Sequence, residues 1–140
     1  MLLTVGLIAG CASGPAAMAP ILNIVQISRV SPVRTAAETT VPVDYRIDIE
    51  NPLDHSVTLV SVEIETVGES GGYLMRRVRH RFSQVVPAHG SSSINLRAWV
   101  QPLQMTDSGQ VVTAVMLRGT ARFESEGSIV QSAFTKRLAQ

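Results

Sequence analysis

The sequence predicts an all-β protein, an immunoglobulin- or fibronectin III-like antiparallel β-sandwich of about seven strands. Three observations carry this prediction. Apolar and polar residues alternate with a period of two in several short runs. Turn-forming residues separate these runs at the spacing of a two-sheet sandwich, and no run shows a convincing amphipathic helical pattern. The 140 residues are enough for one domain with one core.

The clearest strand signal lies between Val41 and Glu50, where every second residue is apolar. Charged residues fill most of the positions between, as on a sheet face that meets solvent. Because β-branched residues crowd this stretch, a helix is disfavoured there. The alternating apolar residues are Val41, Val43, Tyr45, Ile47 and Ile49.

Six further runs complete the predicted set of strands. In the run after His55 the alternation changes phase between Leu59 and Val60, which predicts a β-bulge. The segment 101–110 is expected to be a polar loop, and 124–127 a tight turn. The runs are Ile24–Val30, Val57–Val67, Tyr73–Val86, Ser93–Val100, Val111–Phe123 and Ser128–Leu138.

Two turns have residues that we interpret as determinants of the fold. Asn51 can bond the turn backbone at the end of its strand, and Pro52 then stops the hydrogen-bonded ladder. Pro87 and Gly90 frame the second turn. All four are expected to serve structure and not ligand binding.

The chain begins with a short apolar run, which is followed by its only cysteine. The two meet in the sequence Leu7-Ile8-Ala9-Gly10-Cys11. The run is too short to span a bilayer as a helix, and fits the apolar region of an export signal. It resembles the lipobox of bacterial lipoproteins, in which the cysteine is acylated and becomes the first mature residue. Two or three acyl chains are enough for stable membrane anchoring.

Other interpretations of this terminus stay open. The first ten residues contain no Lys or Arg, as if the charged start of a signal lay upstream. Residues 17–19 form an Ala-Met-Ala sequence that an ordinary secretory signal peptidase could cut. Cys11 could also be a small buried apolar residue.

The lipoprotein hypothesis divides the chain into three parts. Residues 1–10 are the signal peptide, 11–22 the lipidated cysteine with a flexible tether, and 23–140 the sandwich domain. Ala12 follows the cysteine, and by resemblance to enteric-type lipoproteins a residue other than Asp there favours the outer membrane. We therefore expect an outer-membrane lipoprotein that faces the periplasm; the alternative is a soluble periplasmic protein.

Charge and motif content argue against catalysis. A net charge of +1 and few aromatic residues give no reason to expect a nucleic-acid partner. His55, His80 and His89 do not have the spacing of metal ligands, and no nucleotide loop or serine-nucleophile elbow is present. An Asp54–His55 pair beside serines could suggest a triad, but we expect no enzyme, no cofactor and no metal.

One basic cluster, Arg76, Arg77, Arg79 and Arg81, is unusual in the chain. Strand geometry is expected to put Arg77, Arg79 and Arg81 on one face, and Arg76 with His80 on the other. The structural interpretation is pairing with an acidic row, either Asp44, Asp48 and Glu50 or Glu63 and Glu65. The functional interpretation is contact with anionic headgroups or an acidic polymer of the envelope.

Trp99 falls on the polar face of its predicted strand, two residues from Arg97. It could stack on Arg97 as a cation–π pair, mark a contact patch, or be covered by a loop.

Four pieces of sequence, in order, resemble the late embryogenesis abundant type 2 family, also called the water stress and hypersensitive response domain. The pieces are Ile47–Pro52, Val60–Ile64, Val86–Leu96 and Leu117–Phe123, within a resemblance that covers about 24–138. The basic strand near Tyr73–Arg81 departs from that family's pattern.

The resemblance implies a fibronectin- or immunoglobulin-like sandwich and a non-enzymatic role tied to desiccation or envelope stress. It supplies no catalytic residue. Together these observations predict a lipid-anchored binding or protective domain of the envelope, with an envelope protein as a possible partner. The alternative is a structural subunit of a larger envelope assembly that binds partner proteins through its sheet edges.

Overall fold

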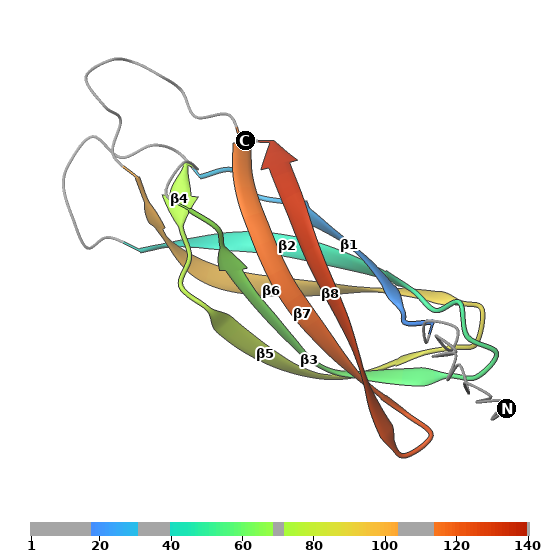
Figure 1. The fold of residues 1–140 in the computed structure, drawn as a ribbon. Coiled ribbons are helices and arrows are strands. Elements are labelled where there is room, and N and C mark those ends of the chain that lie inside the picture. The colour runs from blue at the N-terminus through green and yellow to red at the C-terminus, as the bar shows by residue number, and fades with distance from the viewer. Residues whose placement is uncertain (1–17, 31–39, 69–71, 104–113, 140) are drawn as a thin grey trace, which may run out of the picture.

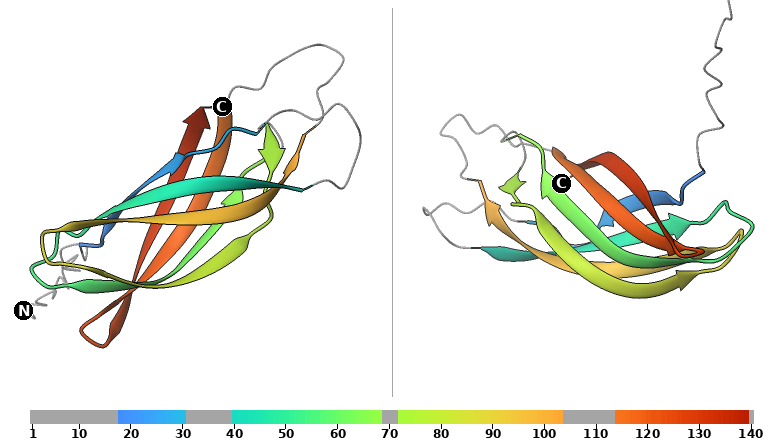
Figure 2. Two further views of the ribbon diagram at one scale, coloured as in Figure 1. Left: turned by 180° about the vertical axis from the view of Figure 1, so that it is seen from behind. Right: turned by 60° about the horizontal axis from the view of Figure 1, so that its bottom comes forward.

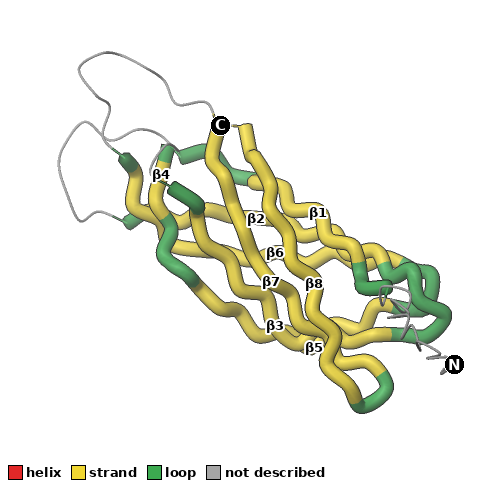
Figure 3. The backbone as a smooth tube through the Cα atoms, viewed as in Figure 1, coloured by secondary structure: helices red, strands yellow, loops and turns green. Residues whose placement is uncertain are grey.

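The chain is described here from a computed structural model that covers residues 18–30, 40–68, 72–103 and 114–139. Within these ranges it forms strands, loops and turns but no helix (Figures 1 and 3). The strands are β1 Ile21–Gln26, β2 Val41–Glu50, β3 Val57–Thr66, β4 Tyr73–Leu74, β5 Val78–Val86, β6 Ser91–Pro102, β7 Ala114–Ser125 and β8 Ser128–Ala139.

The strands form two antiparallel sheets of four strands each. The first sheet has the order β1-β2-β6-β4 and the second the order β5-β3-β7-β8. The sheets face one another as the two layers of a sandwich (Figure 2). The fold class predicted from the sequence, an all-β antiparallel sandwich, is confirmed.

Alternate residues of the long strands build the core between the sheets. On β2, Tyr45 and Ile47 are fully buried. On β6, Leu96 pairs with Tyr45, and Ala98 is the next inward-facing residue along the strand. On β7 of the second sheet, Leu117 and Phe123 are also fully buried and face the first sheet. The period-two pattern thus marks the inner face of each strand.

The predicted bulge is present in β3. The pairing of β3 with both β5 and β7 shifts register between Leu59 and Ser61. Leu59 and Val62 are both fully buried, although they are three positions apart in sequence and not two or four. The extra residue therefore keeps the apolar side chains of both strand halves in the core.

The run predicted as one strand, Tyr73–Val86, is two strands in different sheets. β4 pairs with β6 in the first sheet, whereas β5 pairs with β3 in the second. Between them the chain is fixed by Thr66, whose hydroxyl accepts from the Met75 amide at 3.0 Å. This crossing between layers raises the count from seven predicted runs to eight strands.

Other strand boundaries differ by a few residues. β1 begins at Ile21, inside the segment expected to be tether, and ends at Gln26 where the prediction continued to Val30. β7 begins at Ala114 in the described part of the chain. The β7–β8 turn has positive φ at Glu126 and Gly127, the geometry of a type I′ hairpin.

One end of the sandwich collects three turns and the start of β1; we call it the turn end. Ile21 pairs with Glu50 just before the β2–β3 turn, and the Asn51 amide donates to the Gly90 carbonyl in the β5–β6 turn at 2.8 Å. The His55 ring reaches Ser125 at the β7–β8 turn. Figure 1 shows the C-terminus at the opposite end.

Candidate functional site

The outer face of the second sheet carries an excess of positive charge, and we call it the arginine face. Cross-strand register places six arginines and three glutamates on it, all of them partly or fully exposed. The residues are Arg77, Arg79, Arg81, Arg118, Arg122 and Arg137, with Glu63, Glu65 and Glu124. By contrast, the outer face of the first sheet is slightly acidic, with Asp44, Asp48 and Glu50 against Arg46 and Arg97.

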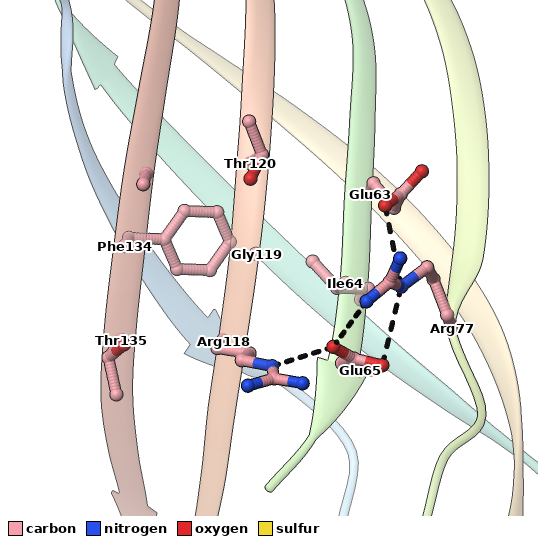
Figure 4. Close-up of a pocket in the computed structure, with 10 residues that line it drawn as sticks. Glu63, Ile64, Glu65, Arg77, Arg118, Gly119, Thr120, Phe134 and Thr135 are labelled. Carbon is pink, nitrogen blue, oxygen red and sulfur yellow. Dashed lines mark hydrogen bonds and ion pairs between the residues drawn. The ribbon is translucent and has the colours of Figure 1, made fainter.

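A shallow depression of about 320 Å³ lies on the arginine face (Figure 4). At its rim Glu65 is held by two arginines, with Arg118 Nε 2.6 Å and an Arg77 terminal nitrogen 3.1 Å from the same carboxylate oxygen. Glu63 accepts from Arg79 at 2.7 Å and lies 3.5 Å from Arg77. Two glutamates thus form ion pairs with three of the surrounding guanidinium groups, Arg77, Arg79 and Arg118.

The ion pairs change the acidity of the central carboxylate. The Arg77 guanidinium, and after it Arg118, lowers the pKa of Glu65 below its ordinary value, against the opposing effect of burial. Glu65 in turn raises the pKa of Arg77. Glu65 is therefore ionised over the whole physiological range and is not suited to general acid chemistry.

The floor of the depression depends on Gly119. A Cβ at this position would collide with the Phe134 ring and lie 2.5 Å from the Glu63 carbonyl oxygen. Phe134 pairs directly with Gly119 across β7 and β8, and Figure 4 shows its ring directed toward the glycine. The missing side chain therefore leaves room for the aromatic ring.

A second depression, of about 410 Å³, opens at the turn end. Its polar lining includes Asp48, Glu50, His89 and Ser91. Asp48 already accepts from the Ser93 hydroxyl at 2.6 Å. Within the described residues, no group of three His, Cys, Asp or Glu side chains is arranged to hold a metal ion.

The predicted basic cluster is divided by the fold. Arg77 and Arg79 pair with glutamates of β3, as the structural interpretation with Glu63 and Glu65 supposed. Arg81 lies on the same face and makes no ion pair among the described residues. Arg76 lies before β5, exposed in the β4–β5 connection, so it is not part of the strand to which it was assigned.

The other side chains of β5 alternate as predicted. His80 and Phe82 share the inner side, with ring centroids 6.5 Å apart. Val78 and Phe82 pack against the core. The exposed face of β5 is therefore the one that carries Arg79 and Arg81.

Trp99 is 60% exposed on the outer face of β6 and pairs across the sheet with Pro42. Among the described residues no cation–π contact joins it to Arg97, whose guanidinium makes two hydrogen bonds to Asp44, at 2.7 and 3.1 Å. That contact lowers the pKa of Asp44 and raises that of Arg97. Trp99 is therefore exposed and not stacked on Arg97, and its role in a contact patch stays a prediction.

Asn51 bonds the turn backbone, in the way its sequence position suggested. Its amide donates to the carbonyls of His55, Val86 and Pro87 at 2.9, 3.2 and 3.0 Å, and its oxygen accepts from the Leu53 amide. The side chain is fully buried. It joins the end of β2 in the first sheet to the end of β5 in the second, which is a structural role.

The neighbouring turn residues complete this arrangement. Pro52 follows Asn51 outside the strand, where it ends the ladder. Gly90 donates to the Pro87 carbonyl at 3.0 Å, and a Cβ on Gly90 would lie 2.5 Å from Pro87 Cγ. His89 takes a positive φ of 50° between them.

Sequence reasoning named the Asp54–His55 pair but missed its partner Ser125, which completes a hydrogen-bonded chain at the turn end. Asp54 Oδ1 lies 2.8 Å from His55 Nδ1, and His55 Nε2 lies 2.7 Å from Ser125 Oγ. The connectivity is that of a catalytic triad, but the burial is reversed, since the Asp54 side chain is 88% exposed and Ser125 is buried. We assign it to holding the β2–β3 turn against the β7–β8 turn.

The predicted membrane anchor lies outside the part of the chain that the structure describes. Cys11, the predicted lipidation site, falls in residues 1–17, which the structure does not describe. Within the described ranges, the chain has no apolar helix of membrane-spanning length.

Comparisons with known proteins give a fold neighbour and no family. No family model matches the sequence, and no curated protein matches it. The chain is similar in structure to a protein solved by X-ray crystallography as Northeast Structural Genomics Consortium target SoR45. The two share a TM-score of 0.57 and 15% sequence identity, over 86% of this chain and 84% of the other. This likeness supports the sandwich fold alone.

Proposed function

We propose that the chain is a non-catalytic binding domain of the bacterial cell envelope, anchored by lipid on Cys11. It faces the periplasm from the outer membrane and uses the arginine face to contact an anionic surface. On the basis of its sequence resemblance, we also propose that the chain is a member of the late embryogenesis abundant type 2 family and acts in desiccation or envelope stress.

The charge imbalance of the arginine face carries this proposal. Three of its six arginines pair with glutamates, whereas Arg81, Arg122 and Arg137 make no ion pair among the described residues. Arg76, exposed in the β4–β5 connection, also makes no ion pair within the described ranges. Exposed guanidinium groups near an anionic membrane surface contribute about 1 kcal/mol each to its binding.

Two measurements test the two parts of the proposal. Metabolic labelling with palmitate should mark the wild-type chain and not Cys11→Ser; equal labelling of both would remove the anchor. Sedimentation of the Cys11→Ser chain with phosphatidylglycerol vesicles should recover more protein than with phosphatidylcholine vesicles. Equal recovery would remove the anionic-surface contact.

A second candidate is a structural subunit that adds a strand to a partner protein. β8 is an edge strand of twelve residues. Ser125 and Ser128 flank a two-residue turn, so they form a hydrogen-bonded pair with each other. The N–H and C=O groups of Ile129 and of every second residue after it therefore point away from β7, to the open edge of the sheet. Native mass spectrometry of cross-linked detergent extracts tests this candidate, and a monomer without a partner would contradict it.

A further inference from the structure

The register of the second sheet aligns a first row of three charged side chains across the arginine face. Glu65 of β3 lies between Arg118 of β7 and Arg77, which continues the register of β5. Both guanidinium groups bond the same Glu65 oxygen, at 2.6 and 3.1 Å (Figure 4). Two arginines on flanking strands can therefore converge on one oxyanion above the central strand.

A second row repeats this arrangement four residues along each strand. Ser61 of β3 lies between Arg81 of β5 and Arg122 of β7. Neighbouring strands are about 4.8 Å apart, so the two arginine backbones are separated by about 10 Å, as in the first row. The rows differ in the central residue, which is a serine here instead of a glutamate.

The side chains of the second row have no partners among the described residues. Neither Arg81 nor Arg122 makes a hydrogen bond or ion pair there, and both are exposed. Ser61 is 9% exposed between them, and its hydroxyl also makes no hydrogen bond within the described ranges. Two cationic donors and one neutral donor thus surround a position where the first row holds a carboxylate.

The nearest acidic groups do not fill this position. Glu63, two residues from Ser61 on β3, accepts from Arg79 at 2.7 Å and faces Arg77 at 3.5 Å. Glu124, two residues from Arg122 on β7, is exposed and makes no ion pair with it. The bulge between Leu59 and Ser61 lies directly at the row, a placement common beside binding sites.

We propose that Arg81, Ser61 and Arg122 form a binding site for a phosphate group. Each guanidinium can donate to one phosphate oxygen, and the serine hydroxyl can donate to a third. Phosphate presents separate oxygens that match the planar guanidinium fork, which the single atom of a chloride ion does not. This inference rests on the proposed function and specifies the site and ligand chemistry of its anionic contact. The phosphate could come from a phospholipid headgroup or from free phosphate.

The first experiment titrates inorganic phosphate into the full chain carrying Cys11→Ser, at constant ionic strength against chloride. The Nε–Hε NMR signals of Arg81 and Arg122 should shift together and saturate, while that of Arg137 should stay in place. Arg137 is a matched control because it is an unpaired arginine of the same face outside the row. Shifts of equal size at all three would overturn the site.

Substitutions then separate a site from general charge. Arg81→Gln and Arg122→Gln should each weaken phosphate binding by on the order of tenfold, since each loses a charge-assisted hydrogen-bond partner. Arg137→Gln should leave it within about twofold, because that residue lies outside the row. If Arg137→Gln weakens binding as much as Arg81→Gln, the row is not a site.

Ser61→Glu provides a test in the opposite direction. It should rebuild the composition of the first row, abolish phosphate binding, and keep the wild-type circular dichroism spectrum. Ser61→Ala should weaken binding by a few-fold, because the hydroxyl donor is lost while both guanidinium groups remain. Undiminished binding by a folded Ser61→Glu variant would overturn the proposal.

Vesicle sedimentation identifies the source of the phosphate. If phosphatidylglycerol vesicles recover the Cys11→Ser chain and both row variants reduce that recovery, the ligand is a lipid headgroup. If phosphate binds in the row but vesicles recover nothing, the site takes free phosphate and the membrane contact fails. If the row variants sediment like the parent chain, other arginines make the membrane contact. The ligand of the row is then free phosphate where the titration finds binding, and the phosphate site fails where the titration finds none.

Discussion

The hydroxyl groups of Tyr45 and Tyr73 lie 2.6 Å apart inside the core of the sandwich. Both side chains are at most 1% exposed, and Tyr73 also donates to Gln26 Oε1 at 2.8 Å. Three strands of the first sheet, β1, β2 and β4, are linked by this polar chain. Because β4 has two residues, side-chain bonds of this kind are important for holding it in place.

Loss of the Tyr73 hydroxyl should destabilise the protein measurably. Tyr73→Phe leaves the buried Tyr45 hydroxyl without its partner, which is expected to lower the free energy of unfolding by about 1–3 kcal/mol. Tyr45→Phe leaves the Tyr73 bond to Gln26 intact and should cost about 1 kcal/mol. Urea unfolding of the three proteins measures both values, and equal stability of all three would contradict the role of the pair.

The same pair predicts the response to alkali. Burial raises the pKa of Tyr45 far above its ordinary value of about 10. Above pH 10 the unfolded chain loses this proton while the folded chain keeps it, so stability should fall as pH rises. Phenolate absorbance at alkaline pH should show Tyr45 titrating together with unfolding. Tyr45→Phe should lose stability less steeply over this range.

Replacement of Asn51 should loosen the turn end. Asn51→Ala removes a buried amide that three carbonyls share, and we expect unfolding to become easier by about 2 kcal/mol or more. Asn95→Ala is the matched control, because Asn95 is exposed on β6. Thermal unfolding should separate the two variants clearly; similar midpoints would show that the Asn51 bonds contribute little.

Part of the cost of a side chain at position 119 should come from the Phe134 ring. Gly119→Ala forces the new methyl group against the ring and the Glu63 carbonyl, a clash that should cost about 1–3 kcal/mol. Phe134→Ala removes the ring, so the double variant should lose less stability than the sum of the single variants. A double-mutant cycle from denaturant unfolding measures this coupling, and strict additivity would exclude the proposed contact.

Removal of Arg77 should bring the pKa of Glu65 closer to its ordinary value. Arg77 is the largest cause of the lowered pKa of this carboxyl, so Arg77→Ala should raise it, and Arg118→Ala should raise it by less. A lowered pKa gives stability at neutral pH that is lost as the solution is acidified through it. Carboxyl ¹³C NMR titration of the three proteins gives the values directly. An unchanged Glu65 titration in Arg77→Ala would contradict the pairing.

Much of the fold was predictable because the relevant signals are local. The alternation in β2 and the phase change at Leu59 each report which side chains face the core, and both were read from sequence. Asn51 was identified from the turn chemistry of an Asn-Pro pair. The division of Tyr73–Val86 was missed. The apolar phase does shift between Met75 and Val78, but a phase shift by itself does not tell a bulge within one strand from a change of sheet.

The candidate sites depended on long-range register and so were mostly hidden. The sequence showed four clustered arginines, but Arg118, Arg122 and Ser61 reach them only through the pairing of β3 with β5 and β7. The His55–Ser125 bond likewise joins residues 70 positions apart. Local spacing carries no information about which strands become neighbours.

The place of β1 determines how the domain responds to mechanical load. β1 is an edge strand that pairs with β2, and it begins at the turn end, where the preceding chain arrives. Tension pulling the chain away from that end would act along the strand axis and strain all of its ladder bonds at once. β1 would then behave as a shear-resistant clip instead of peeling off bond by bond.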